Sequence, residues 1–271
     1  MNKDLILAKL QENEWITIRE LTEIFNVGYG TMQKFLKDNN IITKSKSERL
    51  SLRNKINCTE PPINITKNVN QIIIGSLLGD GSIIRKGTNC IFVNEHSQVQ
   101  SEYVKYLYTL SINNSFEVKI RTSKGYENSI NGRPIKNNGR IGIYSKVNQE
   151  LNKYRDTWYP KGKKIIPDTV FQLEALGLAI WFMDDGCYHQ GTKNYYISTD
   201  GFIYDDIIKL TNMLSKNFDL QTSIHKRKNN YVIYIKAESR EHFKELIQPY
   251  MCESMNYKII GHIKHSELLE N

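Results

Sequence analysis

Ile73-Ile74-Gly75-Ser76-Leu77-Leu78-Gly79-Asp80-Gly81 is the stretch of sequence on which the fold depends. It recurs in altered form as Leu178-Ala179-Ile180-Trp181-Phe182-Met183-Asp184-Asp185-Gly186. Each stretch predicts an apolar helix that needs burial on nearly every side and that ends in Asp-Gly. An isolated charge at such a buried helix end is costly unless a metal ion or a cation lies beside it.

One copy alone has an ordinary explanation, because many buried helices stop at a glycine and carry a solvated acid beside it. Two copies favour an internal duplication with one acid in each half. If the two helices pack side by side, Asp80 and Asp185 lie at the same end of their interface. The sequence therefore predicts a pair of carboxylates at the centre of a duplicated domain.

The composition sets the class of protein. A chain of 271 residues can bury a sizeable core and suggests two domains, or one large domain with an appendage. No run approaches the roughly 18 apolar residues of a membrane span, and the first residues lack a signal-peptide pattern. We therefore expect an intracellular protein, in the cytoplasm or nucleoid or in an organelle matrix. Structural zinc and a disulfide framework are not expected, because the cysteines are scattered at Cys58, Cys90, Cys187 and Cys252.

The net charge of +8 favours a polyanionic partner, and its distribution says more than its total. Residues 117–146 contain seven basic side chains against two acids, and residues 225–236 contain no acid. Alternation in Val118-Lys119-Ile120-Arg121-Thr122 predicts a strand with one face on helices and cations on the other. A single strand of this kind is often just a solvated face, but basic strands in both halves favour a continuous basic surface.

Residues 1–43 predict three short helices, near residues 4–10, 17–25 and 31–39, with a capping box in Thr17-Ile18-Arg19-Glu20. They resemble a helix-turn-helix module, whose second motif helix would enter the major groove of DNA. Five basic and six acidic side chains give the module a weak electrostatic footprint for DNA. A packing or partner role therefore stays open beside DNA contact.

Basic residues concentrate just after this module. Residues 44–55 contain Lys44, Lys46, Arg49, Arg53 and Lys55 against Glu48 alone. Since Pro61-Pro62 follows, residues 44–62 predict an extended basic linker that could track phosphates.

The duplicated body is expected in residues 63–160 and 161–271. In the first half, the helix ending at Asp80 precedes a strand at 83–94, a helix at 101–110, a strand at 116–122, a polar loop near 131–134, a strand at 140–144 and a helix at 146–154. In the second, the helix ending at Asp185 precedes a strand at 195–199, a helix at 204–217, strands at 222–227 and 231–236 with a turn at 227–230, and a helix at 239–250. This order predicts an α+β protein made of two related halves.

The two motifs resemble those of the LAGLIDADG homing endonucleases, and in particular the single-chain, intron-encoded members that contain both copies. The match runs from about Ile63 to Lys258 and is most specific at residues 181–186, at Lys163-Lys164-Ile165-Ile166-Pro167 and at Tyr257-Lys258. This resemblance implies an αββαββα half repeated with pseudo-two-fold symmetry around the motif helices. Gly75 and Gly79 allow close helix packing, whereas Ile180 and Asp184 replace them in the second motif. Such asymmetry suits a monomer that reads a non-palindromic site.

The resemblance also implies the site. Asp80 and Asp185 are its essential metal ligands, assisted by the backbone carbonyls of Gly79 and Asp184, and each acid directs cleavage of one DNA strand. Oxygen ligands of this kind suit Mg²⁺, and Mn²⁺ can substitute. Lys164 and Lys258 match positions where an ammonium group polarises water or stabilises developing charge. Asn94 and Glu95 are both candidates for a further polar position of the active site.

Contacts to DNA would fall to basic side chains on the outer sheet face, where some read bases and others hold phosphates. The candidates are Arg85, Lys86, Lys119, Arg121, Arg140, Lys193, Lys226, Lys228 and Lys236.

Three functions fit this scaffold. The leading hypothesis is a site-specific endonuclease that cuts double-stranded DNA with divalent metal ions. The alternatives are a maturase that binds its host intron RNA and a DNA-binding regulator. Both acids are present, which favours cleavage, because a binding-only protein has no need for paired carboxylates that repel DNA.

Overall fold

The computed structural model describes residues 2–13, 16–45, 47–48, 62–130, 133–228 and 230–260. The chain divides into two compact units, Met1–Glu60 and Pro61–Asn271. Among the described residues, no helix is both long enough and apolar enough to cross a membrane.

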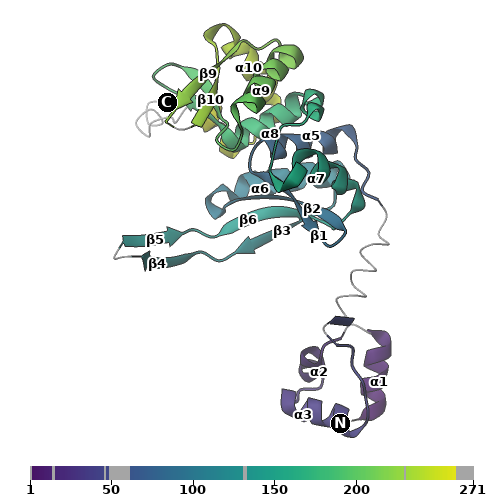
Figure 1. Cartoon of the computed structure of the whole chain (residues 1–271). Coiled ribbons are helices and arrows are strands. Elements are labelled where there is room, and N and C mark those ends of the chain that lie inside the picture. The colour runs from purple at the N-terminus through teal and green to yellow at the C-terminus, as the bar shows by residue number, and fades with distance from the viewer. Residues whose placement is uncertain are drawn as a thin grey trace. The chain divides into compact units, whose positions relative to one another are not determined.

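The first unit contains the three helices expected from the sequence, α1 (Lys3–Glu12), α2 (Ile18–Ile24) and α3 (Tyr29–Asp38) (Figure 1). The predicted capping box is present: the Glu20 N–H donates to Thr17 Oγ1 at 3.0 Å, and the Thr17 N–H donates to Glu20 Oε2 at 2.6 Å. The helices share a small core of Ile6, Ile16, Leu21, Met32 and Leu36. Residues 46 and 49–61, most of the predicted basic linker, lie outside the described residues.

Two apolar helices pack against each other at the centre of the second unit, α5 (Lys67–Leu78) and α8 (Ala175–Asp185) (Figure 1). Their backbones approach closely, because a Cβ on Gly75 would lie 2.4 Å from the carbonyl oxygen of Gly177. The contact with Gly75 thus comes from Gly177, one turn before the Ile180 that replaces the motif glycine. Farther along, a Cβ on Gly79 would lie 2.4 Å from Asp184 Cβ.

Each half contributes one four-stranded antiparallel sheet, which confirms the predicted α+β duplication. The first has the order β1 (Gly81–Lys86), β2 (Asn89–Ser97), β6 (Arg140–Ser145), β3 (Val118–Ser123). The second has the order β7 (Gly186–His189), β8 (Asn194–Ser198), β10 (Asn230–Ile235), β9 (Thr222–Arg227).

Helices cover one face of each sheet, and both halves contribute to one apolar core. The covering helices are α6 (Ser101–Asn113), α7 (Asn152–Trp158), α9 (Tyr204–Phe218) and α10 (Arg240–Ile247), and α11 (Tyr257–Ile260) follows. Short 3₁₀ turns lie at Gln98–Gln100, Gln149–Leu151, Pro160–Gly162, Asp168–Gln172, Ala237–Ser239, Gln248–Tyr250 and Glu253–Met255.

Several element boundaries differ from expectation. The single strand predicted at residues 83–94 is a hairpin of β1 and β2, because Gly87 turns the chain with φ +70°. Strand β7 was not predicted, since it follows the Asp-Gly motif without an apolar run of its own. The helix expected at 146–154 begins only at Asn152, after a 3₁₀ turn.

The polar loop expected near residues 131–134 is instead a two-stranded ribbon, β4 (Tyr126–Ile130) and β5 (Arg133–Asn137), whose tip at 131–132 lies outside the described residues. Figure 1 shows that it extends the β3 and β6 pair away from the helices. The second half has only a short turn at the matching place, after Arg227, where Lys228 has φ 53°. The two halves therefore differ most in the reach of this hairpin.

Replacing Gly75 by alanine tests the backbone contact of the motif helices. The added Cβ meets backbone atoms that cannot swing away, so Gly75→Ala should destabilise the fold by about 1 to 3 kcal/mol. Urea unfolding measures the change. Gly201→Ala is the matched control, because nothing lies within 4 Å of its Cβ position. Equal stability of the two variants would contradict the close packing.

Candidate active site

Each motif helix turns directly into the first strand of its own sheet. Helix α5 ends at Leu78 and β1 begins at Gly81, while α8 ends at Asp185 and β7 begins at Gly186. A Cβ on Gly81 would lie 2.6 Å from Ser76 Cβ, and one on Gly186 would lie 2.1 Å from the Phe182 ring. The Asp-Gly pair is thus a tight reversal that leaves an acid at the end of each helix.

Three carboxylates crowd this end of the helix pair. The Asp80 side chain is 48% exposed, whereas that of Asp184 is fully buried. Burial, and then the charges of Asp80 and Asp184, raise the pKa of Asp185 to about 7. Burial also raises the pKa of Asp184 to about 6, against the charge of His96. The pKa of Asp80 is lowered, because His96 donates a hydrogen bond to its carboxylate.

Two lysines contact the carbonyls at the same helix ends. Lys164 Nζ donates to the carbonyls of Gly79 and Gly81, at 3.3 and 3.2 Å. Lys258 Nζ donates to the carbonyls of Met183 and Asp184, at 2.6 and 2.9 Å. A cation is favoured at a helix C-terminus by the helix dipole. Burial lowers the pKa of Lys164 to about 8, although the nearby carboxylates oppose the shift.

Strand β2 adds an imidazole that sequence reasoning missed. Its alternation turns Asn94 and His96 toward the helices and Glu95 toward the open face, where Glu95 accepts a 2.5 Å hydrogen bond from the Tyr144 hydroxyl. His96 Nδ1 lies 3.3 Å from Asp80 Oδ2, and the Asn94 amide lies 3.4 Å from Asp184 Oδ2. Of the two candidates, the structure therefore brings Asn94 to the site and not Glu95. Period-two alternation from Asn94 was the signal that could have found His96.

The donor set suits a divalent cation. Ligand atoms of Asp80, His96 and Asp184 all lie within 4.8 Å of one another. Burial and the neighbouring acids raise the pKa of Asp184 and Asp185, so a cation would relieve their mutual repulsion. Carboxylate and carbonyl oxygens are the ligands that Mg²⁺ and Mn²⁺ prefer.

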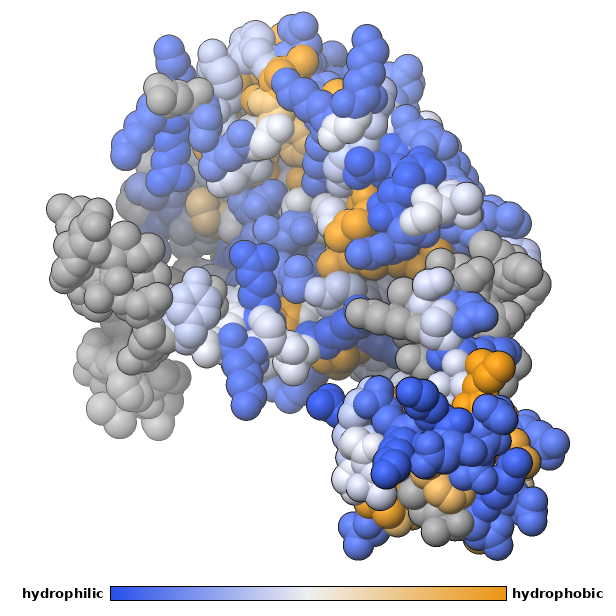
Figure 2. Space-filling model, turned by 60° about the horizontal axis from the view of Figure 1, so that its bottom comes forward, coloured by the Kyte–Doolittle hydropathy of each residue, from blue (hydrophilic) through white to orange (hydrophobic). Residues whose placement is uncertain are grey.

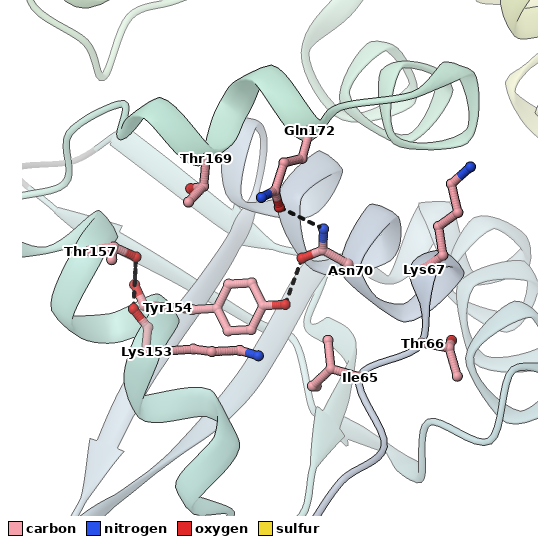
Figure 3. Close-up of a pocket in the computed structure, with 9 residues that line it drawn as sticks. All are labelled: Ile65, Thr66, Lys67, Asn70, Lys153, Tyr154, Thr157, Thr169 and Gln172. Carbon is pink, nitrogen blue, oxygen red and sulfur yellow. Dashed lines mark hydrogen bonds between the residues drawn. The ribbon is translucent and has the colours of Figure 1, made fainter.

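A separate pocket of about 380 Å³ lies at the opposite end of α5, beside Thr66 and Lys67 (Figure 3). Figure 3 shows a chain of polar groups across it, in which the Tyr154 hydroxyl donates to Asn70 at 2.6 Å and Asn70 donates to Gln172 at 3.3 Å. Its lining contains no carboxylate. The contact between Asn70 and Gln172 joins the two halves away from the acids, so the pocket is distinct from the candidate active site.

Comparison with known proteins agrees with the fold. The profile of the LAGLIDADG DNA endonuclease family matches residues 70–243. The chain belongs to this family. It is 31% identical over 219 residues to the cytochrome b mRNA maturase bI2 of Debaryomyces hansenii, a match that covers 75% of this chain and 77% of the relative.

Two further proteins extend this comparison. The probable intron-encoded endonuclease 1 of Wickerhamomyces canadensis is 28% identical over 206 residues, covering 73% of this chain and 87% of that protein. The structure of the homing endonuclease I-WcaI bound to its DNA recognition sequence superposes with a TM-score of 0.62 at 24% identity. This match covers 84% of this chain and 99% of that one, and it shows a shared fold.

Strand alternation decides which predicted DNA contacts face the solvent in this LAGLIDADG chain. In the first sheet, Lys86, Lys119, Arg121 and Arg140 are exposed on the open face, and Arg121 lies 4.7 Å from the centre of the Tyr144 ring. Arg85 lies on the helix side instead, where its guanidinium pairs with Asp156 at 2.8 Å. Arg85 therefore lies on the opposite sheet face from the one predicted for it.

The open face of the second sheet is mainly aromatic. His225 stacks on Tyr234 with 4.8 Å between ring centres, and Tyr196 lies 5.0 Å from Tyr234. Lys226 pairs in register with Tyr231 on the helix side of the sheet, which is a correction to its predicted orientation. The other predicted lysines lie outside the strands: Lys193 and Lys228 in turns and Lys236 after β10.

Figure 2 shows one face of the molecule, where hydrophilic residues dominate and apolar residues form small separate patches.

The raised pKa values predict an unusual pH dependence of stability. Between the ordinary pKa of an aspartate and about 7, the folded protein binds more protons at Asp184 and Asp185 than the unfolded chain does. Lowering the pH from 8 to 5.5 without divalent ions should therefore stabilise the fold by about 1 to 2 kcal/mol, after allowance for partial exposure. Chemical unfolding at both pH values measures this gain.

Asp185→Asn removes one of these titrating groups. The variant should be more stable than wild type at pH 8, and the difference should shrink at pH 5.5. Asp200→Asn, an exposed aspartate in a turn, is the matched control. A stability difference between Asp185→Asn and wild type that does not change with pH would contradict the raised pKa of Asp185.

Proposed function

We propose that this chain is a site-specific, Mg²⁺-dependent endonuclease that cuts both strands of double-stranded DNA. The observation that carries the proposal is the meeting of Asp80 and Asp185 at one end of two packed helices, with a lysine at each helix end. Its family, and its similarity to the probable intron-encoded endonuclease 1 of Wickerhamomyces canadensis, support the same activity.

The proposed cleavage uses two divalent ions. The Asp80 and Asp185 carboxylates would hold them together with the carbonyls of Gly79 and Asp184, since each carbonyl keeps a second lone pair beside its lysine contact. When bound, such ions supply an activated water and neutralise charge on the phosphate and on the leaving oxygen. Manganese suits the same oxygen donors and should substitute for magnesium.

Lys164 and Lys258 complete the site from opposite sides. Their ammonium groups are held by two carbonyls each, so their positions are fixed before DNA arrives. Fixed donors stabilise developing negative charge without reorganisation. With a pKa of about 8, Lys164 can also exchange a proton with water near neutral pH.

The open sheet faces would bind the DNA target. Lys86, Lys119, Arg121 and Arg140 suit phosphates and guanine edges, while the Tyr196, His225 and Tyr234 face suits polar and apolar base edges. Each half would thus read a different half-site. A monomer with two unlike halves is sufficient for such a target. We propose that it acts inside the cell, where that DNA lies.

The N-terminal unit would add a further contact to DNA. Helix α3 follows α2 after a short turn and exposes Tyr29, Gln33, Lys34 and Lys37, as the second helix of a helix-turn-helix does. Its near-neutral charge suits an accessory role that lengthens the footprint.

A maturase function is the second candidate. The cytochrome b mRNA maturases bI2 of Debaryomyces hansenii and Saccharomyces cerevisiae are 31% and 32% identical to this chain. The chain spans 56% of the length of the Saccharomyces cerevisiae protein. Its partner would be the RNA of a host intron. Binding RNA without cleavage does not require the paired acids, so the two functions separate by mutation.

Loss of either acid tests the endonuclease. With a plasmid library of candidate insertion sites in Mg²⁺, Asp80→Asn and Asp185→Asn should each reduce double-strand cleavage by roughly 100-fold or more, the scale of losing a transition-state charge contact. Gel analysis of linear product measures the loss, and Asp200→Asn is the control.

The endonuclease proposal would be contradicted if wild type cleaved none of the sites, or if both variants cleaved as wild type does. Stimulation of intron splicing by the Asp80→Asn protein would assign the maturase function in addition. No effect on splicing by wild type would remove that second candidate.

Deletion of residues 1–45 tests the role of the N-terminal unit. A DNA-contacting module predicts a shorter footprint and about ten-fold weaker binding, the loss of roughly 1.4 kcal/mol. Footprinting in Ca²⁺ with a cleavable site measures both quantities. An unchanged footprint and affinity would assign the unit to packing or to another partner.

A further inference from the structure

The side chain of Asp184 belongs to the second half of the protein, but among the described residues its hydrogen-bond donors all lie in the first half. Its Oδ1 accepts a 2.7 Å hydrogen bond from the Tyr103 hydroxyl. Its Oδ2 accepts from the Asp80 N–H at 3.1 Å and from the Asn94 amide at 3.4 Å. His96 Nε2 lies 3.7 Å from Oδ1. A fully buried carboxylate therefore crosses the interface and organises the end of the other motif helix.

Two routes connect this carboxylate to Asp80. The first is direct, through the Asp80 backbone N–H. The second passes through His96, whose Nδ1 lies 3.3 Å from Asp80 Oδ2 while its other nitrogen faces Asp184. The His96 ring is itself packed edge-on against Tyr103, at 5.0 Å between ring centres. Backbone and side chain of Asp80 are thus both held, although its carboxylate is half exposed.

Among the described residues the reverse arrangement does not occur, because the equivalent positions hold other residues. Gly79 stands where the second helix has Asp184, so α5 has no side chain at the position from which Asp184 reaches across. Asn94 pairs with Gly81, and its counterpart paired with Gly186 is Ile197. Two residues farther, Thr199 takes the place of His96 and donates to the Tyr231 carbonyl at 2.6 Å.

Asp185 accordingly lacks comparable support. Within the described part of the chain, no group donates a hydrogen bond to its carboxylate, and the charges that act on its pKa are those of Asp80, Asp184 and the two lysines. Preorganised ligands cost less reorganisation when the reacting groups come together. The two sites therefore differ in how firmly their acids are held.

We propose that Asp184, with Tyr103 and His96, is a positioning cluster for Asp80 that makes the two strand cleavages unequal. The strand served by Asp80 is cut first, and the nicked duplex is then cut by the less firmly held Asp185 site. This inference rests on the proposed endonuclease function, but the position of the Asp184 cluster can be tested by metal binding alone.

Tyr103→Phe removes one hydrogen bond to Asp184 and keeps the aromatic ring. The matched control is Tyr106→Phe on the same helix, since that hydroxyl donates to the Tyr250 carbonyl at 2.7 Å and points away from the acids. The substrate is a duplex with a different label on each strand, containing a site that wild type cuts. Strand-resolved single-turnover rates in Mg²⁺ give the two nicking constants.

Wild type should nick one strand first. Tyr103→Phe should slow that strand about ten-fold, which corresponds to roughly 1.4 kcal/mol, and change the other by less than about two-fold. Tyr106→Phe should leave both rates at the wild-type values. Equal slowing of both strands, or equal behaviour of the two tyrosine variants, would overturn the proposal.

Titration of the protein with Mn²⁺, followed by electron paramagnetic resonance, tests the cluster without cleavage. Two sites of unequal affinity are expected; Tyr103→Phe should weaken the tighter one, whereas Tyr106→Phe should not. Unchanged affinity in Tyr103→Phe would overturn the proposal even if the protein cuts DNA. If the variant weakens Mn²⁺ binding as expected but wild type cuts no DNA, the endonuclease function is contradicted and the positioning cluster is supported.

Discussion

The backbone contact between α5 and α8 is the constraint on which the rest of the structure depends. Gly75 meets the carbonyl of Gly177 at a distance that leaves no room for a side chain. Because the helices approach this closely, their C-terminal ends lie together, and the Asp-Gly reversal at each end leaves an acid at the interface. Each reversal also starts a sheet, so the same contact sets the positions of the two open sheet faces.

Close approach has an electrostatic consequence that shapes the site. Three aspartates gather where burial already disfavours charge, and the pKa values of Asp184 and Asp185 rise as a result. The protein counters this repulsion with His96, Lys164 and Lys258, which are all held by hydrogen bonds or ionic contacts to the two helix ends. Carboxylate and carbonyl oxygens gathered at the two helix ends make the site suitable for divalent cations.

The sequence contained much of this account. The repeated Asp-Gly motif located Asp80 and Asp185, and the resemblance to the family located Lys164 and Lys258; the structure brings all four to one place. Tyr103 and the side chain of Asp184 were not found as site residues, because their roles depend on a contact across the two halves that no local pattern encodes. His96 was also missed, although strand alternation from Asn94 could have indicated it. Arg85 and Lys226 were placed on the wrong face, since charge alone does not fix the register of a strand.

Anomalous diffraction from crystals of the protein with target DNA and Mn²⁺ tests the central claim most directly. The account predicts metal peaks at the ends of α5 and α8, one coordinated by the Asp80 carboxylate and one by that of Asp185, beside the scissile phosphates. Peaks at other side chains only, or DNA bound away from these two acids, would contradict it.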